Sequence, residues 1–391
     1  MSDKKPDHIR IFHTADWHLG REFHGADLSD AHRHFFDWLV GQIEERQVDL
    51  VIMAGDIFDR ALPPLNAIGT FNDAVNRLAK LAPVVLITGN HDSTVRLSHG
   101  PLLRDGIHLR SGTVGIGSPI VMDDGPFPLA IYPIPYLDPI AAAPEIEADA
   151  ATHEAVLGRA VEICLQDLAG REEGTRSVGV AHAFVTGAQT SDSERGIFVG
   201  GSEEVPASVF ESFDYLALGH LHRPQDVGKR VRYSGSPLFL SYSEVSGEEE
   251  KSVTIIDLDA DGSTTVDPVR IPPFARLSLI RGTLEELLES DEYASVEDHW
   301  LEITLTDTSR PDAPMERLRK RFPHVMSLRF SELSLGETSQ EAERLRELSR
   351  TSPMKLITEF LVDVRGEGPD KDELEILQQG LDHSTSSEVR S

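Results

Sequence analysis

Short apolar runs that each end in a small polar motif constrain most strongly what this chain can fold into. The first three runs cover His8–Thr14, Asp49–Ala54 and Pro83–Thr88. Each run has the length of a buried strand, and apolar residues with helical spacing lie between the runs. Strands that alternate with helices are typical of a mostly parallel sheet covered by helices, so we predict an α/β fold.

The same alternation continues to about residue 260. It predicts four further strands, which cover Leu129–Tyr132, Ser177–Val180, Tyr215–Leu218 and Ser252–Leu258. Two intervening segments repeat their apolar residues as amphipathic helices do. Their apolar faces consist of Phe35, Leu39 and Ile43 and of Ala67, Phe71, Val75 and Leu78. We therefore expect one α/β sandwich domain over residues 1–270.

A smaller unit follows Pro272-Pro273, a dipeptide that marks a linker where the pattern changes. Residues 274–330 predict an α+β domain. Within it, Thr283 and Glu286 have the spacing of a capping box, which predicts a helix over Thr283–Ser290. The other expected elements are strands at Ala275–Ile280, Trp300–Leu305 and Val325–Phe330 and a helix at Met315–Arg321.

The C-terminal part of the chain is more polar. Residues 331–381 predict a linker and two short amphipathic helices, and residues 382–391 predict a disordered tail. The apolar faces of the two helices fit either a partner protein or the chain's own core. These faces consist of Ile357, Phe360, Leu361 and Val364 and of Leu374, Leu377 and Leu381.

Charge and cysteine content exclude several classes of protein. The formal net charge is −29, whereas proteins that hold nucleic acid by themselves usually present a basic surface. The charge therefore argues against tight binding of nucleic acid by this chain alone, but not against cleavage of DNA that a partner delivers. Cys164 is the only cysteine, so neither an intrachain disulfide nor a cysteine-based metal site is expected. The chain has no run of about 18 apolar residues and no apolar signal segment at its start, so we expect it in the cytoplasm.

Five polar motifs supply the ligands of a two-metal site. Each motif alone is compatible with an ordinary loop or turn. All five follow predicted strands, however, and the carboxyl ends of strands are where open α/β sheets bind ligands. The motifs contribute Asp16 and His18, Asp56 with Asp59, Asn90 with His91 and Asp92, His182, and the pair His220 and His222.

The type of ligand narrows the choice of metal. Imidazole, carboxylate and amide ligands without a thiolate suit Mn²⁺, Fe or Zn²⁺, whereas a site made only of oxygen would suit Mg²⁺. We expect two Mn²⁺ ions bridged by Asp56. His91 is positioned to protonate a leaving oxygen, Asp92 to align His91, and Asp59 to orient a metal-bound imidazole. Two metals with such a histidine indicate hydrolysis of phosphate esters.

The ordered motifs D-x-H, G-D-x-x-D, G-N-H-D, H and G-H-x-H resemble those of the calcineurin-like metallophosphoesterases. Within that superfamily, Asp16-Trp17-His18-Leu19-Gly20, Gly55–Asp59 and Tyr233–Pro237 are similar to the SbcD-type nucleases, the nuclease subunits of bacterial ATP-dependent SbcCD complexes. The resemblance implies a two-sheet αββα sandwich, a capping domain at 274–330 and C-terminal helices that dock on an SbcC-type coiled-coil ATPase.

The resemblance also assigns roles to individual residues. It implies that Asp56 bridges the two metals and that His91 is the catalytic histidine, with Asp92 as its partner. The remaining metal ligands would be Asp16, His18 and His222 for one ion and Asn90, His182 and His220 for the other. The implied activities are 3′→5′ exonuclease action on duplex ends and endonuclease action at hairpins, in recombination and repair, by a homodimer within a heterotetramer.

Two other functions are compatible with the same motifs. The chain could be a phosphodiesterase or phosphatase for small molecules, although neither the cap nor the amphipathic tail is needed for that. It could also be a scaffold without activity, although Asp56, Asn90 and His91 are all present. For the nuclease, each of several basic residues is either a contact with DNA phosphates or an ordinary solvated surface residue. These residues are Arg21, Arg60, Arg96 and Arg230 and the basic segment Arg317, Arg319, Lys320 and Arg321.

Overall fold

The computed structural model describes residues 7–94, 97, 105–194, 204–245, 250–331, 369 and 373–374. The helices predicted within 353–381 and the tail predicted at 382–391 lie outside this part of the chain, apart from the single residues just named. In the described ranges, no helix combines the length and the apolar character that crossing a membrane requires.

Two six-stranded sheets form the larger unit, which comprises Met1–Leu279 and Val296–Glu302. In the first sheet, β1, β4, β5 and β6 are parallel, and β13 and β14 add antiparallel strands beside β1. Its order is β14 (Thr264–Arg270), β13 (Ser252–Asp259), β1 (His8–Thr14), β4 (Leu50–Ala54), β5 (Val84–Ile87) and β6 (Ile107–Arg110).

The second sheet has a similar plan, with a parallel centre and antiparallel edges. Its order is β11 (Gln225–Asp226), β12 (Val231–Tyr233), β10 (Tyr215–Gly219), β9 (Arg176–His182), β8 (Leu129–Ile134) and β7 (Ile120–Met122). Shorter elements connect these strands: β2 (Glu22–Phe23) pairs with β3 (Ala26–Asp27), and there are 3₁₀ turns at η1 (Ala207–Phe210) and η2 (Tyr242–Glu244).

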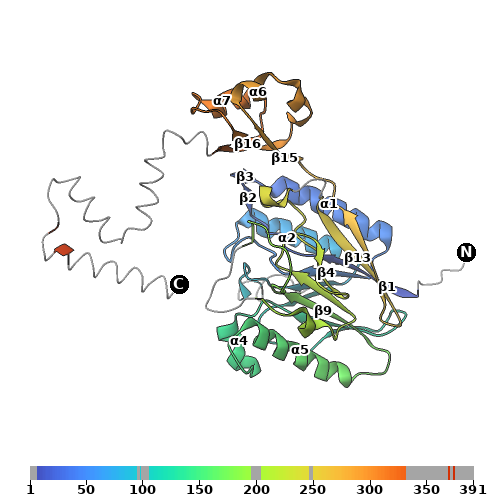
Figure 1. Ribbon diagram of the computed structural model, residues 1–391. Coiled ribbons are helices and arrows are strands. Elements are labelled where there is room, and N and C mark those ends of the chain that lie inside the picture. Colours follow the sequence, from blue (N-terminus) through green and yellow to red (C-terminus); the bar gives the residue numbers. More distant parts are fainter. Residues whose placement is uncertain are drawn as a thin grey trace, which may run out of the picture. The chain divides into compact units, whose positions relative to one another are not determined.

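Helices cover the outer faces of the two sheets (Figure 1). The helices α1 (Ser29–Arg46) and α2 (Leu65–Leu78) pack on the first sheet, and α4 (Pro139–Ile146) and α5 (His153–Ala169) pack on the second. A third apolar cluster fills the space between the sheets, with Ile11 and Ile52 on one side and Ile131 and Val180 on the other. This arrangement confirms the predicted αββα sandwich.

The central strands are apolar on both faces because both faces are buried. In β4, Leu50, Ile52 and Ala54 belong to the cluster between the sheets, whereas Val51 and Met53 belong to the cluster under α1 and α2. Alternate residues of a strand point to opposite faces, so a strand between two apolar layers is a continuous apolar run. This is why such runs predicted the central strands correctly.

The strand boundaries agree with the sequence at the centre of each sheet and less well at the edges. The predicted bounds of β1 are confirmed without change, and β9 is longer than predicted and ends at His182 itself. The pattern of apolar runs did not reveal β6, β7, β12 and β14. The edge strand β14 is mostly exposed, and therefore lacks the apolar run on which the prediction depended.

The smaller unit comprises Ile280–Ser295 and the chain from Ile303 onward. A three-stranded sheet in the order β15 (Leu277–Gly282), β16 (Trp300–Leu305) and β17 (Val325–Phe330) is accompanied by α6 (Leu284–Glu289), η3 (Asp291–Val296) and α7 (Pro314–Arg319). The predicted capping box is present: Thr283 Oγ1 accepts from Glu286 N, and Glu286 Oε2 accepts from Thr283 N. The α+β character of this unit is as predicted.

Candidate metal centre

The predicted ligands converge because five strands end at the same edge of the sandwich. The strands β1, β4 and β5 come from the first sheet and β9 and β10 from the second. Backbone hydrogen bonds of 3.0 Å from Asp16 N to Gly55 O and from His18 N to Asp56 O join the loops that follow β1 and β4. The Asp16 carboxylate accepts from His220 N at 2.9 Å and joins these loops to β10 of the other sheet.

The backbone at this edge adopts unusual conformations. Asp16, His18 and Asp56 have φ values of 53°, 45° and 53°, and His220 has a φ of 107°. Positive φ values are uncommon for residues other than glycine, and they cluster at functional sites, where the surrounding structure holds the strained backbone in place. Four predicted ligands are therefore held by the fold in orientations that an unconstrained chain would rarely adopt.

Two glycines of the motifs allow the loops to approach one another closely. Gly55 has a φ of 90°, and a Cβ atom at this position would collide with the His182 ring. A Cβ atom on Gly89 would collide with the Asp56 carboxylate. The glycine before each motif therefore makes room for a ligand that belongs to another motif.

The first group of ligands surrounds the ring of His18. His18 Nε2 lies 3.0 Å from His222 Nε2 and 3.6 Å from Asp56 Oδ2. Ligand atoms of Asp16, His18 and Asp56 lie within 4.8 Å of one another, and all three residues are buried. This is the juxtaposition expected for one of the two ions.

The second group surrounds Asn90. Its Oδ1 lies 2.9 Å from His182 Nε2 and 3.3 Å from His220 Nδ1. His182 Nε2 is also 3.5 Å from Asp56 Oδ2, and Asp56, His182 and His220 together could hold a metal ion. The Asp56 carboxylate therefore belongs to both groups, which is the position required of a bridging ligand.

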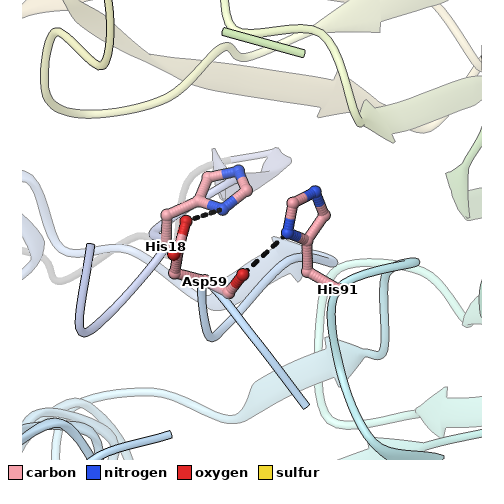
Figure 2. Close-up of side chains that lie close together, drawn as sticks. All are labelled: His18, Asp59 and His91. Carbon is pink, nitrogen blue, oxygen red and sulfur yellow. Dashed lines mark hydrogen bonds and ion pairs between the residues drawn. The ribbon is translucent and has the colours of Figure 1, made fainter. Parts of the chain in front are cut away.

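His91 lies beside Asp56, with Nε2 3.9 Å from Asp56 Oδ2. Figure 2 shows Asp59 between the rings of His18 and His91: Oδ1 lies 3.7 Å from His18 Nδ1, and the backbone carbonyl lies 2.8 Å from His91 Nδ1. These three residues also have the spacing of a metal site. The Asp59 carboxylate makes no hydrogen bond with His18 Nδ1, so its role in orienting a metal-bound imidazole stays a prediction.

The expectation that Asp92 aligns His91 is wrong. The Asp92 carboxylate instead accepts from the backbone N–H groups of Ile57, Phe58 and Gly89, at 3.0, 2.9 and 2.9 Å. Burial and the charge of Asp56 raise the pKa of Asp92 to about 7, although these backbone donors lower it. Asp92 therefore joins the loops after β4 and β5. The group that contacts His91 Nδ1 is the Asp59 backbone carbonyl.

Burial and mutual charge set the protonation of the site. Burial alone would raise the pKa of Asp56, but the His182 ring, whose Nε2 lies 3.5 Å from Asp56 Oδ2, holds this pKa well below its usual range. Burial lowers the pKa of His220 to about 3 and that of His18 well below its usual value. Asp56 is therefore ionised, and His18 and His220 are neutral with a lone pair to offer.

This donor set fits divalent cations. The described residues bring together ionised carboxylate, neutral imidazole and amide oxygen, with two imidazole nitrogens facing each other at 3.0 Å. Such mixed ligands without thiolate suit Mn²⁺, Fe or Zn²⁺. A cation between the groups would also compensate the charge of two buried carboxylates, Asp16 and Asp56.

Three histidines outside the motifs have structural roles. His13 joins the two sheets through contacts of 3.0 Å with Tyr215 Oη and 3.1 Å with the Leu218 carbonyl. His32 is buried and contacts the carbonyls of Leu28 and Trp17. His24 packs against the rings of Phe23 and Tyr242.

The arginines expected to contact DNA differ in their surroundings. Arg21 is paired with Asp59 at 3.0 Å, and Arg60 is exposed next to it. Arg230 lies near Asp214 at the start of β10, the end opposite to His220, and its contact with DNA stays a prediction. Arg96 lies outside the described residues. In the smaller unit, Arg317, Arg319 and Lys320 are exposed and Arg321 donates to the Leu287 carbonyl.

Comparison with protein families identifies the class to which this fold and site belong. Residues 9–224 match the model of the calcineurin-like phosphoesterases, and the chain belongs to this family. Residues 273–365 match a second model, SbcD_C, described as the type 5 capsule protein repressor C-terminal domain. Together the two matches support an SbcD-type nuclease, in which a metallophosphoesterase domain precedes this C-terminal domain.

Solved structures give more distant similarities. GAP50 of Plasmodium, the anchor in the inner membrane complex, is 11% identical with a TM-score of 0.40, over 67% of this chain and 84% of that chain. The protein TT1561 of Thermus thermophilus is 13% identical with a TM-score of 0.37, over 67% of this chain and 100% of that chain. The nuclease MPE of Pseudomonas putida is 20% identical with a TM-score of 0.23, over 50% of this chain and 79% of that chain.

Proposed function

We propose that this chain is the Mn²⁺-dependent nuclease subunit of an ATP-dependent complex that processes DNA ends and hairpins in recombination and repair. The observation that carries the proposal is the Asp56 carboxylate, shared by two ligand groups and adjacent to His91. The SbcD_C match at 273–365 favours this nuclease over other members of the superfamily. A protein with this function would act on nucleoid DNA in the cytoplasm.

In the proposed mechanism, one set of residues binds the metals and His91 donates a proton. Asp16, His18 and His222 would hold one ion, Asn90, His182 and His220 the other, and Asp56 would bridge both. Two bound divalent ions would supply an acidified water and neutralise charge that develops on the phosphate. Asp59 holds the His91 ring through Nδ1–H, so a doubly protonated His91 would carry its second proton on Nε2 and give it to the departing sugar oxygen.

A cavity beside the ligand loops favours a large substrate. It has a volume of about 1070 Å³, and its lining includes Asn90, Arg110 and Tyr136. The Tyr136 ring also lies 6.4 Å from that of His182. A nucleotide next to the cleaved phosphate would have both space and an aromatic ring against which to pack. A small phosphate ester would leave most of this cavity empty.

Cleavage of labelled DNA is the direct test of the proposed function. A blunt duplex carrying a label at either the 3′ or the 5′ end, and a hairpin, would be incubated with Mn²⁺ and the full chain, alone and with its ATPase and ATP. A 3′→5′ exonuclease releases a 3′ label at once and shortens the 5′-labelled strand progressively. We expect little cleavage by the chain alone, because its net charge of −29 opposes binding of DNA.

The same assay should include bis-p-nitrophenyl phosphate and cyclic nucleotides. Hydrolysis of these small esters, with DNA left intact even when the ATPase is present, would contradict the nuclease and indicate the alternative small-molecule phosphodiesterase. Failure to hydrolyse any ester in the presence of Mn²⁺ would instead indicate the scaffold without activity.

The proposed partner is an SbcC-type coiled-coil ATPase, and we expect a homodimer of the nuclease within a heterotetramer. Deleting residues 351–391 should leave the metallophosphoesterase domain folded but abolish association with the ATPase, because the predicted docking helices lie in this segment. Circular dichroism would check the fold, and co-purification would check the association. Retention of the complex after the deletion would contradict the docking role.

A further inference from the structure

A buried ion pair contacts the loop that carries His222. Lys251 Nζ is 2.5 Å from Glu244 Oε2, and the two residues are only 6% and 2% exposed. Lysine and glutamate are almost never this buried unless they are paired, and burying such a pair contributes little net stability. Stability alone therefore does not account for its presence, and its other contacts point to His222.

Ser193 connects this ion pair to His222. Ser193 Oγ lies 2.6 Å from His222 Nδ1 and 2.5 Å from Glu244 Oε1. Glu244 is paired with Lys251, and an ionised carboxylate only accepts hydrogen bonds. The Ser193 hydroxyl therefore donates to Glu244 and accepts from His222 Nδ1–H.

This direction of donation fixes the tautomer of His222. A proton on Nδ1 leaves the lone pair of a neutral imidazole on Nε2. His222 Nε2 is the nitrogen that faces His18 Nε2 at 3.0 Å, inside the first ligand group. The negative charge of Glu244, transmitted through Ser193, would also make this nitrogen a stronger metal ligand.

The backbone of His222 is held by charged groups as well. Lys251 Nζ donates to the His222 carbonyl at 2.8 Å and to Ser236 Oγ at 2.8 Å. Glu194 Oε1 accepts from His222 N at 2.8 Å. The backbone N–H, the carbonyl and Nδ1 of one residue thus each have a polar partner. His182 differs in that its Nδ1 contacts a backbone carbonyl, that of Ala54 at 2.9 Å, whereas His222 Nδ1 contacts a side chain.

We propose that Ser193, Glu244 and Lys251 are positioning residues that hold His222 in its metal-binding tautomer and orientation. The inference rests on the proposed metal centre, in which His222 is a ligand, and it does not depend on the identity of the phosphate ester. In this proposal the three residues act through His222 and are not themselves metal ligands.

Replacing Ser193 by alanine tests the connection while the Lys251–Glu244 pair stays intact. Calorimetric titration of the full chain with Mn²⁺ should show one site weakened about 10-fold to 100-fold, the usual effect of losing a partner of a metal ligand. ¹⁵N NMR of the metal-free protein should show that His222 loses its preference for the Nδ1–H tautomer. The midpoint of thermal unfolding gives the accompanying change in stability.

Ser177→Ala is the matched control. Ser177 is also a buried serine whose hydroxyl donates to a carboxylate, that of Asp214, but it is the second residue of β9 and lies at the end of the strand opposite to His182. This variant should bind Mn²⁺ as the wild type does. Equal loss of affinity in both serine variants would overturn the proposal, as would wild-type affinity and tautomer in Ser193→Ala.

The double variant Glu244→Gln/Lys251→Met provides a second test that does not depend on how well Ser193→Ala folds. It removes both charges together and therefore leaves no buried ion without a partner. A weaker Mn²⁺ site in the folded protein supports the role of Glu244, and unchanged affinity contradicts it. If the wild type binds two Mn²⁺ but cleaves no DNA, the proposed function fails while this test of His222 remains valid.

Discussion

Replacing His91 by alanine is expected to lower the rate of DNA cleavage about 10²-fold to 10⁴-fold, the usual contribution of a positioned general acid. His91 Nε2 lies 3.9 Å from Asp56 Oδ2, beside the shared carboxylate and outside the two groups assigned to the ions. The variant should therefore keep both Mn²⁺ ions while it loses the proton for the departing oxygen. Single-turnover cleavage of a 3′-labelled duplex and calorimetric Mn²⁺ titration would measure the two properties separately.

His34→Ala is a suitable control for this experiment, because His34 is exposed on α1. It should cleave DNA at the wild-type rate. Unchanged turnover of His91→Ala would remove His91 from the mechanism. Loss of one Mn²⁺ from this variant would instead indicate that the group formed by His18, Asp59 and His91 holds an ion.

The sequence predicted the convergence of the ligands because each motif follows a strand that is buried on both faces. Asp16, Asp56 and Asn90 come after β1, β4 and β5, which are adjacent and parallel in one sheet. Parallel neighbours end at the same edge, so the strand assignment alone places these side chains together. The contribution of β9 and β10 required the second sheet to face the first, which a pattern of apolar runs does not specify.

The contacts that orient the ligands could not be predicted in the same way. The alignment of His91 was assigned to its neighbour Asp92, but the acceptor at Nδ1 is a backbone carbonyl 32 residues away. Ser193 and Lys251 each lie 29 residues from His222, and Glu244 lies 51 residues from Ser193. Such contacts depend on loop geometry, and a serine, glutamate or lysine in a polar loop has no local pattern that distinguishes it from a surface residue.

Replacing Asp56 by asparagine is expected to have the largest effect of all, because one carboxylate serves both ligand groups. Its Oδ2 lies 3.6 Å from His18 Nε2 and 3.5 Å from His182 Nε2. An amide keeps the shape and can still accept from His91 N, but it removes the charge that two cations would share. We expect binding of at least one Mn²⁺ to be lost and cleavage to fall at least about 10³-fold, which corresponds to about 4 kcal/mol.

The matched control for this substitution is Asp214→Asn. The Asp214 carboxylate also accepts from a backbone N–H, that of Ser177, but it lies at the start of β10 and away from the ligand loops. Because asparagine preserves the acceptor at both positions, a difference between the two variants would report the charge at the metal centre and not the loss of a hydrogen bond. Binding of two Mn²⁺ ions by Asp56→Asn with wild-type affinity would contradict a bridging carboxylate, and the two ligand groups would then have to hold their ions independently.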